Sequence, residues 1–205
     1  MTFEQFVAES AAKGRFINTM FEERLFALVG TLERIAKILA DAHIPFELIG
    51  GAAIQIYVNR VEPSAVRNTK DIDIMIHRAD LERIKTVAAE HGFTYRHAAG
   101  LDMLLPPGET KAINSIHLVF SGERVRPNQA VPNPPVRPEH ISVHGVSVGV
   151  IPLADLVQMK LSNNRDIDRV HVRDLHGVGL ITPEIEEALP GVLRERLRDI
   201  LQNAD

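Results

Sequence analysis

The amino-acid sequence predicts an α+β fold, in which a mixed sheet is flanked by helices and followed by a helical C-terminal part. Short apolar runs bounded by Gly and Pro, typical of strands, fill the middle of the chain. Amphipathic segments with apolar residues three and four positions apart precede and follow them. We therefore expect N-terminal helices at 1–44 that pack on the core, an α/β core at 45–151, and helices at 152–205.

The composition is that of an ordinary globular protein. Of the 205 residues, 45% are hydrophobic and 24% are charged, and the net charge is −4. This charge argues against a protein that coats nucleic acid. The absence of Cys excludes disulfides and thiolate metal sites and suits a reducing compartment. The sequence shows no signal-peptide pattern and no apolar run that could span a bilayer, so we expect a cytoplasmic protein without membrane contacts.

Two helices are expected before the core. Residues 2–12 place Phe3, Phe6 and Val7 at helical spacing. Residues 21–42 carry a longer apolar stripe, which suits a helix that packs on a sheet.

The first half of the core is expected to alternate strands with helices. A short strand at 46–49 leads into a helix at 51–59. A loop with a proline follows at 61–68. We then expect a strand at 70–76 and a helix at 78–91.

The second half of the core is expected to be mostly β. Strands are predicted at 93–97, 101–105 and 112–120. Residues 121–139 contain five prolines and no periodicity, which indicates a surface loop or lid rather than core. A hairpin is predicted at 141–151. The C-terminal part is expected to form four helices, at 153–161, 166–175, 183–189 and 191–202.

A Gly-Gly turn joins the first strand of the core to the next helix. Gly50 and Gly51 would leave backbone amides exposed at the positive N-terminus of that helix, which suits a phosphate group. Gly-Gly turns more commonly just permit tight backbone geometry. The turn alone therefore leaves both interpretations open.

Two carboxylates follow on the strand at 70–76. Asp71 and Asp73 are separated by one residue, so their side chains are expected on one face, about 7 Å apart along the strand. Their mutual repulsion needs a compensating charge, and a divalent cation is the obvious candidate. Acids at strand ends also commonly face solvent, so the pair alone is a weak indication.

The order of these features is more specific than either feature alone. A strand, a Gly-Gly turn, a helix and then Arg67-x-Thr69-x-Asp71-x-Asp73 supply a phosphate cradle and a metal platform, as nucleotidyl transfer requires. At these residues the sequence resembles the nucleotidyltransferases of DNA polymerase beta-like fold, and most closely the AbiEii-type and related minimal bacterial members. The resemblance covers about residues 45–180.

This resemblance implies roles for individual residues. Asp71 and Asp73 would bind Mg²⁺ or Mn²⁺ and take part in catalysis. The nucleotide-binding residues implied by the resemblance come from the turn, from the segment around the acids and from the helical part: Gly50, Gly51, Arg67, Thr69 and Lys160.

One position departs from the family pattern. Catalytic members carry a third carboxylate on the strand that corresponds to 112–120, and here that position is His117. An imidazole suits proton transfer, so His117 is a candidate general base. It is a poorer ligand for Mg²⁺, which prefers oxygen. The alternative is a site that has lost catalysis, and Asp102 on the preceding strand is a candidate substitute acid.

A polar face follows Lys160. Asp168, His171 and Asp174 recur at a spacing of three on one helix face. Such a face could hold a metal, but an internal hydrogen-bond cluster is the favoured interpretation, with Asp168 or Asp174 holding the Lys160 ammonium.

Two functions from different classes remain open at this point. The first is an enzyme that moves a nucleoside monophosphate from an NTP to an acceptor on tRNA or on a protein, as toxin-like relatives do, with an antitoxin as partner. The second is a catalytically degenerate protein that binds a nucleotide or a partner without turnover. The residue at position 117 discriminates between them.

Overall fold

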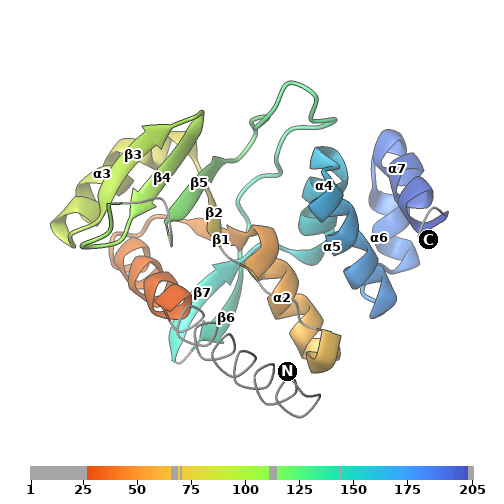
Figure 1. Ribbon diagram of the computed structural model, residues 1–205, viewed down its shortest axis with the longest axis horizontal. Helices are drawn as coiled ribbons and strands as arrows, with labels where there is room; N and C mark the ends of the chain where they lie inside the picture. The colour runs from red at the N-terminus through yellow and green to blue at the C-terminus, as the bar shows by residue number, and fades with distance from the viewer. Residues whose placement is uncertain (1–26, 66–68, 70, 111–114, 144, 203–205) are drawn as a thin grey trace, which may run out of the picture.

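The computed structural model describes residues 27–65, 69, 71–110, 115–143 and 145–202 (Figure 1). The helix predicted at 2–12 and Arg67 lie outside the described residues. Residues 27–41 are helical, in agreement with the later part of the helix predicted at 21–42.

Seven strands form one sheet in the order β3-β4-β5-β2-β1-β7-β6, and helices flank it. The predicted α+β fold with a mixed sheet is therefore confirmed. The strands are β1 (Phe46–Ile49), β2 (Ile72–Ile76), β3 (Thr94–Ala98), β4 (Leu101–Leu105), β5 (Ile116–Phe120), β6 (Glu139–Val143) and β7 (Val146–Val150).

The helices gather mainly on one side of the molecule. Helices α4 to α7 lie together beyond the end of the sheet, while α3 lies beside β3 and β4 on the other side (Figure 1). The helices are α2 (Gly50–Val61), α3 (Leu81–Glu90), α4 (Leu153–Asn163), α5 (Asp166–Gly177), α6 (Pro183–Ala188) and α7 (Gly191–Gln202), with short 3-10 turns η1 (Pro63–Ala65) and η2 (Arg78–Asp80).

The centre of the sheet joins strands that are distant in sequence. Strand β2 runs antiparallel to β1 and parallel to β5. Two parallel neighbours need a crossover connection, and η2, α3, β3 and β4 supply it here. Strand β1 in turn pairs in parallel with β7.

The two faces of β2 differ in character. Ile72, Ile74 and Ile76 are buried on one face, as alternation predicts. Asp73 lies on the opposite face and is half-buried. The strand begins at Ile72, two residues later than predicted, so Asp71 directly precedes it and is exposed.

Residues 121–138, which we name the strap, connect β5 to β6 and cross toward α4 (Figure 1). The proline content predicted a surface loop or lid. Most of the strap is at the surface, but Gln129 and Asn133 within it are each only 3% exposed. The strap is therefore partly built into the core.

In the part of the chain that the structure describes, no helix has both the length and the apolar composition needed to span a bilayer.

Candidate functional site

The turn from β1 into α2 presents free backbone amides. Gly50 has a left-handed φ of 69° and is the first residue of α2. In the described structure no side chain caps this helix, and its first turn contains no acid. The first amides of a helix have no partner within the helix, so they are available to an anion here.

A side chain at either glycine would come too close to a neighbouring residue. A Cβ at Gly50 would lie 2.0 Å from Oδ2 of Asp73, and one at Gly51 would lie 2.8 Å from Oγ1 of Thr69. The turn and the motif residues of the next strand are thus packed against one another, as their common role in a site requires.

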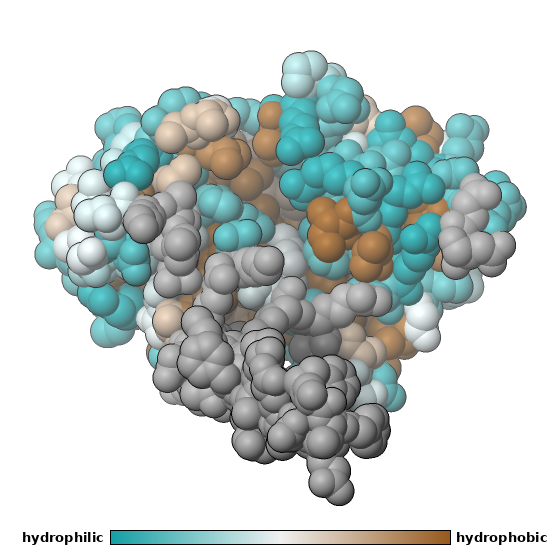
Figure 2. Space-filling view, viewed as in Figure 1, coloured by the Kyte–Doolittle hydropathy of each residue, from teal (hydrophilic) through white to brown (hydrophobic). Residues whose placement is uncertain are grey.

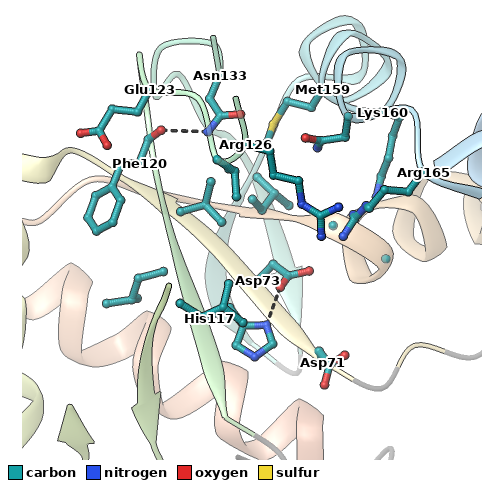
Figure 3. A pocket seen from close by; sticks show the side chains of 18 of the residues that line it. Asp71, Asp73, His117, Phe120, Glu123, Arg126, Asn133, Met159, Lys160 and Arg165 are labelled. Atoms are coloured by element: carbon teal, nitrogen blue, oxygen red, sulfur yellow. Dashed lines mark hydrogen bonds and ion pairs between the residues drawn. The ribbon is translucent and has the colours of Figure 1, made fainter. Parts of the chain in front are cut away.

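The two predicted metal ligands differ in setting. Asp73 extends from β2 and its side chain is 28% exposed. Asp71 is exposed, and its carbonyl oxygen accepts a hydrogen bond from the Thr69 hydroxyl at 3.3 Å. Asp71 and Asp73 flank the entrance to β2, with His117 beside Asp73 (Figure 3).

His117 lies directly beside Asp73. The parallel pairing of β2 and β5 places these two residues in register, and Nδ1 of His117 is 3.0 Å from Oδ1 of Asp73. This hydrogen bond raises the pKa of His117; burial opposes the shift, and the charges of Asp73 and Asp71 add to it. The imidazole therefore occupies the position predicted for the third carboxylate and interacts with both acids.

Asp102 does not join this group. It pairs with Leu118, the neighbour of His117, so its side chain lies on the opposite face of the sheet. There it accepts hydrogen bonds from the Tyr95 hydroxyl and from His97 Nδ1, the latter at 2.8 Å. Asp102 lines the same cavity, but alternation along β4 and β5 puts its side chain on the sheet face opposite Asp73, so the structure does not bring this candidate substitute acid to Asp73.

A buried ion-pair cluster forms the helical wall of the site. Lys160 of α4 and Asp168 of α5 are 4% and 0% exposed, and Lys160 Nζ is 3.2 Å from Asp168 Oδ1. Arg165 binds the same carboxylate through Nε at 2.6 Å and through a second nitrogen at 3.1 Å. Burial lowers the pKa of Lys160, against the effect of Asp168. Asp168 thus holds Lys160, as the internal-cluster interpretation expects.

The other two members of the polar face take different positions. His171 is 8% exposed and lines the cavity near Gly51, where its Cε1 would be 3.9 Å from a Cβ at position 51. Asp174 is on the same helix, α5, and is not among the cavity-lining residues. The structure therefore brings His171, but not Asp174, to the site.

A cavity of about 890 Å³ unites these residues. In the space-filling view the surface is hollowed between the β3–β4 side and the α4–α5 side (Figure 2). The volume is in the range of small-molecule sites. The predicted site residues that line it are Gly50, Gly51, Thr69, Asp71, Asp73, His117 and Lys160.

Four arginines that were not predicted as site residues line the cavity: Arg78, Arg124, Arg126 and Arg165. The side chains of Arg126 and Arg165 extend into it (Figure 3). Arg165 directly precedes α5 and forms a reciprocal cap with Asp168, and the Arg-x-x-Asp spacing is a signal that could have identified it. Arg126 lies in the aperiodic strap, where the sequence pattern gives no comparable signal.

Asp71 and Asp73, two carboxylates that line the cavity, suit a cation that binds together with the phosphates of a substrate. In the described part of the chain, no three His, Asp or Glu side chains are grouped to hold a metal ion. Mg²⁺ is usually bound by one or two carboxylates together with substrate phosphates, not by a cage of protein ligands. Asp71 and Asp73 beside the free amides of α2 fit that pattern.

Comparisons with known proteins identify the family of the chain and a similar fold. The model of the family described as uncharacterised nucleotidyltransferase matches residues 1–159. No curated protein matches the chain. The solved structure of an antigenic nucleotidyltransferase-like protein from Paracoccidioides brasiliensis is similar, with a TM-score of 0.53 and 15% identity over 85% of this chain and 87% of that one. ANT(2")-Ia in complex with adenylyl-2"-tobramycin aligns with a TM-score of 0.45 and 12% identity over 86% and 89% of the chains.

Proposed function

Because the chain belongs to the family of uncharacterised nucleotidyltransferases, we propose that it transfers a nucleoside monophosphate from an NTP to a hydroxyl group of an RNA or a protein. The observation that carries the proposal is the contact between Asp73 and His117 beside the free amides of α2. The proposal is supported by the position of Gly50, Gly51, Asp73 and His117 along one cavity, where they would act as anion site, acid and base.

The triphosphate would bind at the turn from β1 into α2. The amides after Gly50 and Gly51 point from the positive end of a helix, and anions bind at such ends. Thr69 packs on Gly51 and fixes the edge of this cradle. Lys160 adds positive charge from α4, although its ammonium is bonded to Asp168.

Asp71 and Asp73 would hold the divalent cation together with the substrate phosphates. When bound, Mg²⁺ or Mn²⁺ supplies charge neutralisation for the triphosphate. Asp73 would thus have two neighbours, the cation on one side and His117 on the other.

His117 would accept the proton of the acceptor hydroxyl. Its hydrogen bond to Asp73 orients the ring and stabilises the imidazolium that results from proton transfer. The imidazole is 22% exposed, so an acceptor can reach it from the cavity. The resemblance to AbiEii-type enzymes supports a toxin-like role with an antitoxin partner as part of this proposal.

The second candidate is a nucleotide-binding protein without turnover. The observation that favours it is His117 itself, which occupies the register position of the third carboxylate opposite Asp73. The variant His117→Asp separates the two: it should raise transfer activity in a degenerate site and reduce it at least tenfold where His117 is the working base.

The direct test is incubation with each labelled NTP, Mg²⁺ or Mn²⁺, and either bulk tRNA or a protein lysate treated with nuclease. We expect one labelled acceptor class with the wild-type protein and none with Asp73→Asn. Titration calorimetry with each metal–NTP pair should show binding that Asp71→Asn weakens. Absence of binding heat for the wild type, with no effect of either Asn variant, would refute the proposed site.

A further inference from the structure

The strap is ordered by two buried amide side chains. Gln129 Oε1 accepts from the backbone amide of Val125 at 2.7 Å, and Gln129 Nε2 donates to Asn133 Oδ1 at 2.9 Å. Asn133 Nδ2 in turn donates to the carbonyl of Phe120, at the end of β5, at 2.9 Å. A chain of hydrogen bonds therefore runs from the sheet to the outer part of the strap.

A tight turn at 126–129 fixes the backbone of Arg126. The Gln129 amide donates to the Arg126 carbonyl at 3.1 Å. Pro127 is the second residue of this turn, a position where its fixed φ is favourable. Arg126 is thus the first residue of a turn whose last residue is buried in the core.

The far side of the strap is attached to α4. Ser162 Oγ donates to the Val131 carbonyl at 2.8 Å, and the Val131 amide lies 2.9 Å from the same hydroxyl. The Ala130 amide also approaches the Ser162 carbonyl at 3.3 Å. The strap is therefore held to both walls of the cavity, the sheet and α4.

This framework presents the Arg126 side chain to the cavity. Its guanidinium extends from the strap into the space above Asp73, toward the part of the cavity where Arg165 ends (Figure 3). It makes no hydrogen bond or ion pair with any residue that the structure describes.

The other cationic side chains that line the cavity do interact with protein groups. Arg78 binds Glu123 through two nitrogens at 2.5 and 2.6 Å. Lys160 and Arg165 share the Asp168 carboxylate. Arg124 also lines the cavity, and its Nε donates to the Gln129 carbonyl at 3.1 Å. Among the described arginines that line the cavity, Arg126 is therefore the one whose guanidinium has all five N–H donors available to a ligand.

We infer that Arg126 is a phosphate-binding residue, which binds the outer phosphates of the NTP from the side opposite the α2 amides. The inference rests on the proposed function. A guanidinium matches two phosphate oxygens at once, and the backbone that carries it is already fixed by the turn before a ligand binds. The residue would hold the triphosphate in line for transfer and would contact the pyrophosphate that leaves.

The inference can be tested with nucleotides that differ in their number of phosphate groups. Calorimetry with Mn²⁺ and the preferred NTP, then the matching NDP and NMP, should show that Arg126→Ala weakens NTP binding by about 10- to 100-fold. Binding of the NMP should be unchanged within about twofold. Arg126→Lys should recover part of the affinity that Arg126→Ala loses, because the lysine ammonium restores the positive charge but not the bidentate geometry of the guanidinium. The control Arg198→Ala removes one positive charge from α7, where Arg198 pairs with Glu186.

Several outcomes would overturn the inference. Equal losses of affinity for the NTP and the NMP would mean that Arg126 maintains the structure of the strap and does not bind a phosphate. Unchanged nucleotide binding with a raised acceptor KM would make Arg126 an acceptor ligand. Both results leave the proposed function standing. Failure of the wild type to bind any nucleotide would instead refute the proposed function, and this inference with it.

Discussion

Asp73 occupies the space that a side chain at Gly50 would need. A Cβ at position 50 would lie 2.0 Å from Oδ2 and 2.9 Å from Cγ of the Asp73 carboxylate. The glycine turn and the Asp73 carboxylate are therefore packed against each other, so a side chain at position 50 would displace Asp73.

Gly50→Ala should abolish nucleotide binding, whereas Gly51→Ala should weaken it only modestly. The first change clashes with Asp73 and also puts Ala at a φ of 69°, which costs about 1 kcal/mol or more. The second comes closer than 3.0 Å to one atom, the hydroxyl oxygen of Thr69, at 2.8 Å. Calorimetry with Mn²⁺ and NTP measures the difference. Equal effects of the two changes would contradict the proposed packing.

Removal of Asp168 should destabilise the protein far more than removal of Lys160. Asp168→Asn leaves Lys160 buried without a countercharge, and breaking a buried pair in this way costs about 3–5 kcal/mol. Lys160→Met leaves Asp168 paired with Arg165, so we expect on the order of 1 kcal/mol. Urea unfolding gives both values. A larger loss in Lys160→Met would contradict this asymmetry.

A second buried carboxylate lies behind the strap. Glu47 on β1 is 0% exposed and accepts a hydrogen bond from the Arg137 amide. The Arg137 guanidinium binds Asp155 at 2.8 Å. Burial raises the pKa of Glu47 from 4.5 to about 7, Asp155 adds to the shift, and Arg137 opposes it through its amide and its charge.

Glu47→Gln should therefore flatten the pH dependence of stability. The folded protein binds the Glu47 proton more tightly than the unfolded chain does, so the stabilisation is present below about pH 4.5 and is lost as pH rises through 7. The wild type should lose about 2–3 kcal/mol more than the variant between about pH 5 and about pH 8. Urea unfolding at several pH values measures this. Parallel curves would contradict it.

Asn133→Ala should loosen the strap without unfolding the protein. The change removes the donor to Phe120 and the acceptor for Gln129, at a cost of about 1–3 kcal/mol. Hydrogen exchange should accelerate at the Val125 and Gln129 amides. Asn128→Ala is the matched control, since Asn128 is exposed. Equal exchange in the two variants would contradict a buried amide network.

The order of strands and helices could be predicted from the sequence because each has a clear periodicity. The helix predicted at 191–202 is found with these bounds, and the hairpin predicted at 141–151 is found at 139–150. The strand at 93–97 is found one residue later, at 94–98. Local patterns suffice for elements that bury one apolar face.

Residues of the candidate site could be predicted only where they belong to a recognisable sequence motif. Gly50, Asp73 and His117 lie together because register and a tight turn join them. Arg126 could not be predicted, since its position depends on hydrogen bonds of Gln129 and Asn133, which no hydrophobic pattern records. The separation of Asp102 and Asp73 onto opposite faces of the sheet could not be predicted, because sequence order does not reveal the sheet face after a hairpin.

The crossover between β2 and β5 also affects how the protein is made. Asp73 and His117 are 44 residues apart in sequence, and α3, β3 and β4 lie between them along the chain. A chain emerging from the ribosome completes both acids long before it completes their partner. Contacts between distant segments form slowly. Synthesis therefore leaves an interval in which Asp71 and Asp73 have been made but the contact between Asp73 and His117 has not yet formed.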